Sequence, residues 1–217
     1  MGFYKGTDQV YRVHELDAFP WLVHGFGTRN ADIPGLFANL ATLKQIHSST
    51  CLPANGHAGL IGEADALLEN TPGAVVAVKT ADCMPILLVD ERRRAVAAVH
   101  AGWRGTAAGI AGRAVDAMRE QFGTEAGDLH AAIGPGIGEC CYEVGPEVAA
   151  AVQGVVSAGR IHINLTEANR RQLLQAGVTA ERIYASNLCT QCVADDFHSF
   201  RRDREASGRL FSFAGIR

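Results

Sequence analysis

Two side chains with reactive chemistry flank one short charged stretch of this sequence. Cys83 stands in front of an apolar run, His100 ends the next apolar run, and "DERRR" at 90–94 lies between them. A charged loop of this length predicts a hairpin. If its turn is centred between residues 91 and 92, Cys83 and His100 are directly opposed, with Cβ atoms ~5 Å apart. They would then be close enough to share a metal ion or a proton.

The register of this hairpin decides whether the two side chains can meet. A slip by one residue would send one of them to the other face of the sheet. Pro85 has no N–H for the ladder, so the first strand should either lie at an edge or begin at that residue. The second case would leave Cys83 just outside the regular ladder.

A neighbouring cysteine and histidine have three interpretations, and the pair alone does not choose among them. Cys83 can be a small packed side chain beside a hydrogen-bonded His100. The cysteine can be a nucleophile with the histidine as its general base. The two can also be ligands of a transition metal, which then needs a third ligand.

The third ligand would come from one of the other histidines. His47, in "LKQIHSS", stands out because the apolar pattern breaks there into small polar residues, as expected at the start of a functional loop. The remaining candidates are His14, His24, His57, His130, His162 and His198.

The composition favours a protein that acts on small molecules. The chain has 217 residues, 47% of them hydrophobic and 20% charged, with a net charge of -3. This balance gives no general attraction to nucleic acid or to an anionic membrane. The sequence has neither an apolar run of ~18 residues nor the layout of a signal peptide, so we expect a soluble cytoplasmic protein.

Strands and helices alternate along the chain without a linker or a repeat, which predicts a single α/β domain over residues 1–217. Continuous apolar runs predict buried strands, and spacings of three or four predict amphipathic helices. The strands are expected at 74–79, 85–89, 95–99, 129–134 and 182–186. The helices are expected at 106–122 with Thr106 as N-cap, at 146–156 entered through Pro146, and at 166–177.

Six blocks that span most of the chain form a recognisable set: "LKQIHSS", "EADALL", "KTADCMPILLVD", "VHAGWRGTAAGI", "IGPGIGECCYEVGPEV" and "SFRRDREASGR". Together they resemble the laccase-domain family. That family was once described as multicopper polyphenol oxidases and is now described as zinc-dependent purine nucleoside phosphorylases. The resemblance implies a mixed, largely antiparallel sheet with flanking helices, a fold similar to that of cysteine hydrolases of the cytotoxic-necrotizing-factor type.

The resemblance also implies a metal site made by His47, Cys83 and His100, which are also the expected catalytic residues. A site with two histidines, one cysteine and an open position suits catalytic zinc. A multicopper oxidase would instead need several histidine-rich sites, although copper remains an alternative metal. Such a zinc would lower the pKa of a bound water to ~7 and supply the hydroxide that deamination of adenosine at C6 requires.

Phosphorolysis, the other activity that the family implies, needs cations that hold phosphate against the ribose C1′. Guanidinium groups suit phosphate oxygens, and the available ones are Arg29, Arg104 and the pair Arg201 and Arg202. Of these, Arg29, Arg104 and Arg202 are expected to bind substrate, with Lys44 and Gln45 beside them. For any single arginine, solvation or a structural ion pair is an alternative. Trp103 can stack on a purine or anchor packing, and Asp82 can orient a ligand or cap a turn.

Two further features fall outside this site. The segment between Arg29 and Lys44 is shorter than is usual in the family, which implies an absent or rebuilt part of the substrate pocket. "CTQC" at 189–192, followed by His198, is an alternative site for a structural zinc, but it would need a fourth ligand and the sequence has no partner C-x2-C. A redox-active pair is a second alternative, but the block does not open a helix in a clear βαβ unit. We therefore interpret its cysteines as loop thiols and the adjacent Cys140 and Cys141 as packing residues.

The leading hypothesis is a zinc-dependent purine nucleoside phosphorylase for adenosine, inosine, guanosine and methylthioadenosine, with adenosine deaminase activity. One alternative is a cysteine hydrolase or deamidase that uses Cys83 and His100, including an editor of peptidoglycan precursors. Another is a metal-binding protein without enzymatic activity. The expected partners are a purine nucleoside and phosphate, with no nucleic acid and no membrane.

Overall fold

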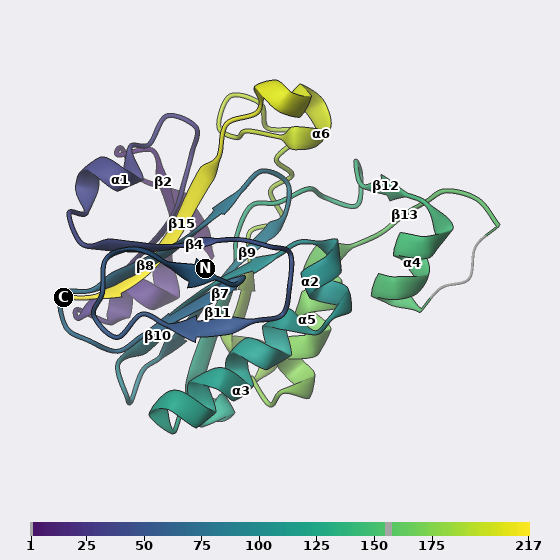
Figure 1. Ribbon diagram of the computed structural model, residues 1–217. Coiled ribbons are helices and arrows are strands. Elements are labelled where there is room, and N and C mark those ends of the chain that lie inside the picture. Colours follow the sequence, from purple (N-terminus) through teal and green to yellow (C-terminus); the bar gives the residue numbers. More distant parts are fainter. Residues whose placement is uncertain (1, 155–157) are drawn as a thin grey trace.

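Strands make up most of the regular structure in the computed structural model, which describes residues 2–154 and 158–217 (Figure 1). The strands are β1 (Phe3–Lys5), β2 (Val10–Val13), β3 (Leu22–Gly27), β4 (Leu40–Lys44), β5 (Cys51–Pro53), β6 (Gly59–Glu63), β7 (Ala66–Glu69), β8 (Val75–Thr80), β9 (Met84–Asp90), β10 (Ala95–Ala101), β11 (Leu129–Ile133), β12 (Glu143–Val144), β13 (Ile161–His162), β14 (Ile183–Ala185) and β15 (Leu210–Ile216). Six α-helices accompany them in the described part of the chain: α1 (Ile33–Leu36), α2 (Trp103–Ala107), α3 (Ile110–Phe122), α4 (Pro146–Gln153), α5 (Leu165–Gln175) and α6 (Phe200–Asp203).

The long strands form two sheets. One has the order β1-β2-β3-β15-β8-β4-β6 and the other the order β14-β11-β9-β10-β7-β5. Most neighbouring strands are antiparallel, but β4 runs parallel to β6 and β8, β5 runs parallel to β7, and β11 runs parallel to β14. The predicted mixed, largely antiparallel α/β fold is confirmed, with its strands divided between two main sheets.

The second sheet is buried on both faces, which explains the continuous apolar runs. Along β9, Leu87 and Val89 pack in a cluster shared with the first sheet, whereas Ile86 and Leu88 pack in the cluster that includes α3 and α5. Figure 1 shows these helices on the outer face of this sheet. A strand covered on two sides has no solvent face, so its sequence does not alternate.

The predicted strands at 74–79, 85–89, 95–99, 129–134 and 182–186 correspond to β8, β9, β10, β11 and β14. The helix expected at 106–122 is divided, and Thr106 is not its N-cap. Gly109 adopts a φ of +80° between α2 and α3, and the buried Thr106 hydroxyl accepts a hydrogen bond from Asn169 Nδ2 at 3.0 Å. Gly123 ends α3 in the left-handed conformation, as expected for a residue after a helix.

The other two predicted helices are present as α4 and α5. Helix α4 begins at Pro146 and ends at Gln153, before Gly154 with φ of +67°. Residues 155 and 156 of the predicted helix lie outside the described residues. Helix α5 has Asn164 as its N-cap, whose side chain accepts a hydrogen bond from the N–H of Glu167.

The hairpin β9–β10 is present, but its register differs from the predicted one by two residues. His100 pairs with Pro85 rather than with Cys83, which lies just before β9. The loop has four residues because the Asp90 carboxylate accepts the N–H groups of Arg92 and Arg93, and Arg94 turns with a φ of +51°. A shift by two residues preserves the face, so Cys83 stays on the same side as His100.

None of the helices in the described ranges has the length and apolar character that a bilayer crossing requires.

Candidate metal centre and its cationic cavity

Three segments that are distant in the sequence bring His47, Cys83 and His100 together. His47 follows β4, Cys83 lies in the turn between β8 and β9, and His100 lies near the end of β10. The potential ligand atoms of the three side chains all lie within 4.8 Å of one another. The two imidazole rings meet nearly edge to face, with centroids 5.0 Å apart. This is the set of residues that the sequence predicted as a metal site.

Asp65 positions two of these three residues, and sequence reasoning did not single it out. Its carboxylate is fully buried. It accepts a hydrogen bond from His100 Nδ1 at 2.8 Å and another from the backbone N–H of His47 at 3.0 Å. It also accepts the N–H and the hydroxyl of Ser48. The only signal in the sequence was the position of this aspartate in "EADALL", directly before an apolar strand.

The bond to Asp65 fixes the orientation of the His100 ring. Because Nδ1 faces the carboxylate, Nε2 is left to face Cys83 and His47. A carboxylate behind a histidine is the usual arrangement at protein zinc sites, where it holds the ring and raises the basicity of the ligand nitrogen. Burial alone would lower the pKa of His100, but the hydrogen bonds to Asp65 and Cys83 outweigh it and raise that pKa.

Cys83 has the character of a ligand thiolate. Burial alone would raise the pKa of this thiol, but hydrogen bonds to His100 and His47 outweigh burial and lower the pKa. Zinc binds thiolate rather than thiol, together with imidazole nitrogen, and at catalytic sites it keeps a position open for water or substrate. The His47, Cys83 and His100 donor set fits this chemistry.

Two glycines of the block "HAGWRG" allow the three side chains to come together. A Cβ on Gly102 would lie 2.9 Å from Cys83 Sγ and 3.2 Å from the His47 ring. A Cβ on Gly105 would lie 3.0 Å from the carbonyl oxygen of Ser48. The segment after β10 can therefore pack closely against Cys83 and the His47 loop only because these two positions have no side chain.

The turn that carries Cys83 is anchored through Asp82. Asp82 has a φ of +82°, which is uncommon for a residue with a side chain but better tolerated by aspartate. Its carboxylate accepts the hydroxyl of Thr190 at 2.7 Å and the backbone N–H of Arg201 at 2.6 Å. Asp82 thus joins the Cys83 turn to the C-terminal segment.

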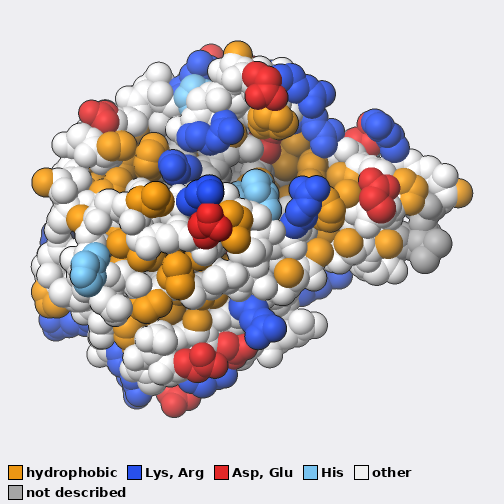
Figure 2. Space-filling model, in the orientation of Figure 1, with side chains coloured by type: hydrophobic (Ala, Val, Ile, Leu, Met, Phe, Trp, Pro, Cys, Tyr) orange, Lys and Arg blue, Asp and Glu red, His pale blue; other side chains and the backbone are white. Residues whose placement is uncertain are grey.

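A cavity of about 700 Å³ opens over the three side chains. Figure 2 shows Lys and Arg side chains gathered around a hollow that contains a histidine. Among the described residues, six cationic side chains line the cavity: Lys44, Lys79, Arg104, Arg201, Arg204 and Arg209. Three aromatic side chains also line it: Trp103, Tyr142 and Phe200. The cavity therefore combines positive charge with flat apolar surface.

Of the five residues expected to bind substrate, Lys44, Gln45 and Arg104 line the cavity. The Gln45 amide is engaged elsewhere, because it donates to the carbonyl oxygen of Lys79 at 2.7 Å and accepts the N–H of Lys79 at 2.8 Å. Lys44 forms an exposed ion pair with Glu63 at 2.7 Å. Arg104 stacks on the Trp103 ring, with 4.3 Å between the guanidinium carbon and the ring centroid.

The other two, Arg29 and Arg202, are not among the residues that line this cavity. Arg29 is exposed and donates to the carbonyl oxygen of Ala194. Arg202 binds Asp203 through Nε and Nη2 and donates to the carbonyl oxygens of Thr190, Gln191 and Phe197. This guanidinium is committed to holding the C-terminal segment. Its neighbours Arg201, Arg204 and Arg209 reach the cavity instead.

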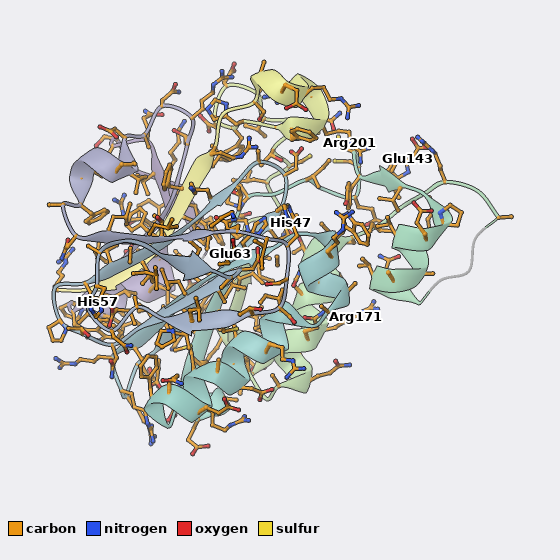
Figure 3. All side chains as sticks on the ribbon, in the orientation of Figure 1. His47, His57, Glu63, Glu143, Arg171 and Arg201 are labelled. Carbon is orange, nitrogen blue, oxygen red and sulfur yellow. The ribbon has the colours of Figure 1, made fainter. Side chains whose placement is uncertain are left out.

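Most of the remaining histidines lie outside the set that could hold a metal. Figure 3 labels His47 between Glu63 and Arg201, whereas His57 lies at the opposite end of the molecule from Arg201. His24 is buried, which lowers its pKa to about 4, and its Nε2 accepts the N–H of Val13. Of the histidines in the described residues, only His47 and His100 belong to a potential metal-ligand cluster.

Comparison with known proteins agrees with the blocks in the sequence. Residues 28–217 match the family model described as multi-copper polyphenol oxidoreductase laccase. The chain belongs to this family. In the crystal structure of YlmD from Geobacillus stearothermophilus, a chain with 28% sequence identity has the same fold, with a TM-score of 0.91 over 99% of this chain and 98% of that one.

Relatives in this family carry names of nucleoside enzymes. A purine nucleoside phosphorylase of Bacteroides thetaiotaomicron is 40% identical over 159 residues, which are 68% of this chain and 59% of that protein. Adenosine deaminase RL5, from an unknown prokaryotic organism, is 42% identical over 159 residues, which are 68% of this chain and 60% of that protein. The chain therefore matches about three fifths of the length of these relatives.

Proposed function

We propose that this family member is a zinc-dependent purine nucleoside phosphorylase in which residues 1–217 act as one catalytic domain. Adenosine, inosine, guanosine and methylthioadenosine are the proposed nucleosides, with inorganic phosphate as the second substrate. The observation that carries the proposal is the coincidence of a zinc-type donor set and a ring of cationic side chains in one cavity.

The cationic ring supports phosphate as a substrate. Phosphate has to be desolvated and held against the ribose C1′ for phosphorolysis. Arg104, Arg204 and Arg209 are exposed side chains on the cavity wall. Among the described residues, none of these three forms an ion pair with a carboxylate. Guanidinium forks match phosphate oxygens in geometry and charge, so these groups are suited to receive the anion.

The aromatic side chains support a purine as the other substrate. Trp103 and Tyr142 line the same cavity, and cations already lie over both rings, Arg104 over Trp103 and Arg201 over Tyr142. A flat, electron-rich base can stack on such surfaces, as aromatic groups prefer offset stacked arrangements. The proposed reaction then joins a phosphate oxygen to ribose C1′, while the electron pair of the C–N bond leaves with the purine.

His47, Cys83 and His100 are the proposed ligands of zinc, and Asp65 is proposed to hold His100 and the His47 loop. When bound, zinc supplies a Lewis acid that polarises an oxygen or water next to the cavity. Copper is the proposed alternative metal, because two imidazoles and one thiolate are also the ligand types of some mononuclear copper sites. The chain's own contribution is to orient the ligands, to neutralise phosphate and to confine the nucleoside.

Deamination of adenosine is a second proposed activity of the same cavity, favoured by the similarity to adenosine deaminase RL5. In that reaction water replaces the amino group at C6 of the purine, and ammonia leaves. The ribose bond stays intact, so phosphate is not consumed. Product analysis distinguishes the two reactions, because one releases adenine and the other releases inosine.

The proposed test is an assay of the purified protein with adenosine, with and without phosphate. We expect adenine and ribose 1-phosphate only when phosphate is present, and loss of both products after a chelator has removed the metal. The cysteine hydrolase alternative predicts that acyl substrates trap Cys83 covalently. It also predicts that the protein keeps its full activity on these substrates after a chelator has removed the metal. No turnover of any purine nucleoside by a zinc-loaded protein would refute the phosphorylase proposal.

Replacing Arg209 with alanine tests the cationic ring. Because one charge-assisted contact to phosphate contributes ~1.5 to 3 kcal/mol, we expect kcat/KM for phosphate to fall about tenfold to a hundredfold, while zinc content stays unchanged. The matched control is Arg119→Ala on α3, whose guanidinium forms an exposed ion pair with Asp116. An unchanged kcat/KM for phosphate in Arg209→Ala, Arg204→Ala and Arg104→Ala would show that the ring of cationic side chains is not part of the phosphate site.

The six cysteines are consistent with the proposed cytoplasmic location. All of them are free thiols in this structure. Thiols persist in reducing compartments, whereas secreted proteins tend to pair them.

A further inference from the structure

A second cluster of metal-binding side chains lies outside the proposed catalytic centre. Cys140, Cys141, Cys189 and Cys192 place their four sulfur atoms within 4.8 Å of one another. The sulfur of Cys192 lies 3.4 Å from that of Cys141 and 3.7 Å from that of Cys140. No pattern in the sequence joins these residues, because the pairs are separated by about fifty positions along the chain. His198, which follows "CTQC" in the sequence, is not a member of this cluster.

The spacing of the sulfur atoms fits a tetrahedral metal site. Four thiolates at ~2.3 Å from a zinc ion stand ~3.8 Å apart along the edges of the tetrahedron. The separations of 3.4 and 3.7 Å between the sulfur atoms are close to this value, and the other sulfur atoms, all within 4.8 Å of one another, need only a small contraction around an ion. They are far longer than the ~2.05 Å of a disulfide bond.

Packing, which the sequence suggested for Cys140 and Cys141, does not account for the cluster. Cysteine that serves only as a small apolar side chain is normally buried. Cys189 is buried here, but Cys140 and Cys192 are exposed. Two exposed thiols directed at a buried thiol are better explained by a shared ligand than by burial of apolar surface.

The backbone around the cluster is shaped for a sulfur ligand. The N–H of Gly138 donates a hydrogen bond to Cys189 Sγ at 3.2 Å. Such bonds stabilise a thiolate bound to a metal. A Cβ on Gly138 would lie 3.1 Å from Cys140 Sγ and 3.1 Å from Cys189 Cβ, so a side chain at this position would crowd the cluster.

We infer that Cys140, Cys141, Cys189 and Cys192 form a structural tetrathiolate site for zinc. Four protein ligands close the coordination sphere, so this site has no position for substrate, unlike the proposed catalytic centre with its three ligands. The ion would join the loop after β11 to the loop after β14.

The position of the site gives it a role in supporting the catalytic wall. Thr190, next to Cys189, donates its hydroxyl to Asp82, and the N–H of Ile137 donates to the carbonyl oxygen of Asp82 at 2.8 Å. Asp82 precedes Cys83 in the turn described above. A metal that ties the two loops together therefore holds Thr190 and Ile137, two of the partners of Asp82, in place.

The test counts metal in protein that lacks the catalytic ligands. Wild-type protein purified under reducing conditions should contain about two zinc ions per chain, and the double variant His47→Ala, His100→Ala should retain about one. Titrating this variant with a mercurial reagent should release that zinc as the four thiols react. Cobalt in its place should give the charge-transfer absorption of a tetrahedral cobalt thiolate.

A matched pair of cysteine variants completes the experiment. Cys192→Ser in the double-variant background should lose the retained zinc, whereas Cys51→Ser should keep it, because Cys51 belongs to neither cluster. If Cys192→Ser does not fold, the cobalt spectrum of the double variant still decides the question. A folded double variant without metal, or a disulfide that joins Cys192 to Cys140 or Cys141, would overturn the inference.

Discussion

Replacing His100 with alanine should abolish zinc binding at the proposed catalytic centre and lower kcat/KM for adenosine by at least about a thousandfold. The substitution removes one of three proposed ligands and leaves the Asp65 carboxylate buried without its imidazole partner. We expect Cys83→Ser to behave alike, because serine is a much poorer zinc ligand than thiolate. Zinc analysis and a coupled assay for released adenine measure the two losses.

The control for this experiment is His57→Ala. His57 is exposed, and its ring Nδ1 contacts the carbonyl oxygen of Ala54 at a distance from the cavity (Figure 3). The His57→Ala variant should keep its zinc and its activity on adenosine. A His100→Ala protein that loses zinc but retains wild-type turnover would show that the metal at this centre is not part of the reaction.

Replacing Asp65 with asparagine should weaken zinc binding at the catalytic centre about tenfold to a hundredfold, the usual effect of removing a carboxylate behind a metal-ligating histidine. It should also lower the free energy of unfolding by ~2 kcal/mol, because the buried carboxylate accepts N–H groups from the His47 loop as well as the His100 ring. Competition with a zinc indicator and denaturant unfolding of the metal-free protein measure the two effects separately.

The stability effect of Asp65 should depend on pH in a defined direction. Burial alone would raise the pKa of this carboxyl, but hydrogen bonds from His100 and Ser48 outweigh it and lower the pKa to about 2. A lowered pKa stabilises the fold above the carboxyl's unfolded pKa of ~3.9, and this contribution is lost as the pH falls toward 2. Wild type should therefore lose its advantage over Asp65→Asn between these values.

The matched control is Asp116→Asn, an exposed carboxylate that is paired with Arg119 on the surface of α3. An exposed pair of this kind contributes little, so zinc affinity and the free energy of unfolding should change by less than about 0.5 kcal/mol. Equal zinc affinity in wild type and Asp65→Asn would show that the carboxylate does not position His100.

The sequence was most informative where local pattern and local structure coincide. The apolar runs around "DERRR" correctly predicted strands β9 and β10, because a strand buried on two faces has to be apolar throughout. The register was wrong by two residues, because Asp90 closes a four-residue loop through the N–H groups of Arg92 and Arg93. Side-chain capping of this kind leaves no periodic signal.

The three predicted metal residues lie together in the structure. Of the arginines predicted to bind substrate, Arg104 lines the cavity, whereas Arg29 and Arg202 do not. "SFRRDREASGR" contains four arginines, and the sequence could not tell which of them face the cavity. The short helix α6 turns Arg202 toward backbone carbonyl oxygens and leaves Arg201 and Arg204 on the cavity side. The direction of a side chain at the end of a helical turn depends on what packs against that turn.

By itself the sequence determined the mixed α/β class, the buried strands, the chemical types in the proposed metal centre and the family. Tertiary structure decided which distant residues meet. Asp65 acquired its role because β7 begins beside the His47 loop, and the four-cysteine cluster exists because β11 and β14 run parallel and end at the same edge of the sheet. Contacts between segments so far apart depend on strand order, which hydrophobic patterns along a single chain do not encode.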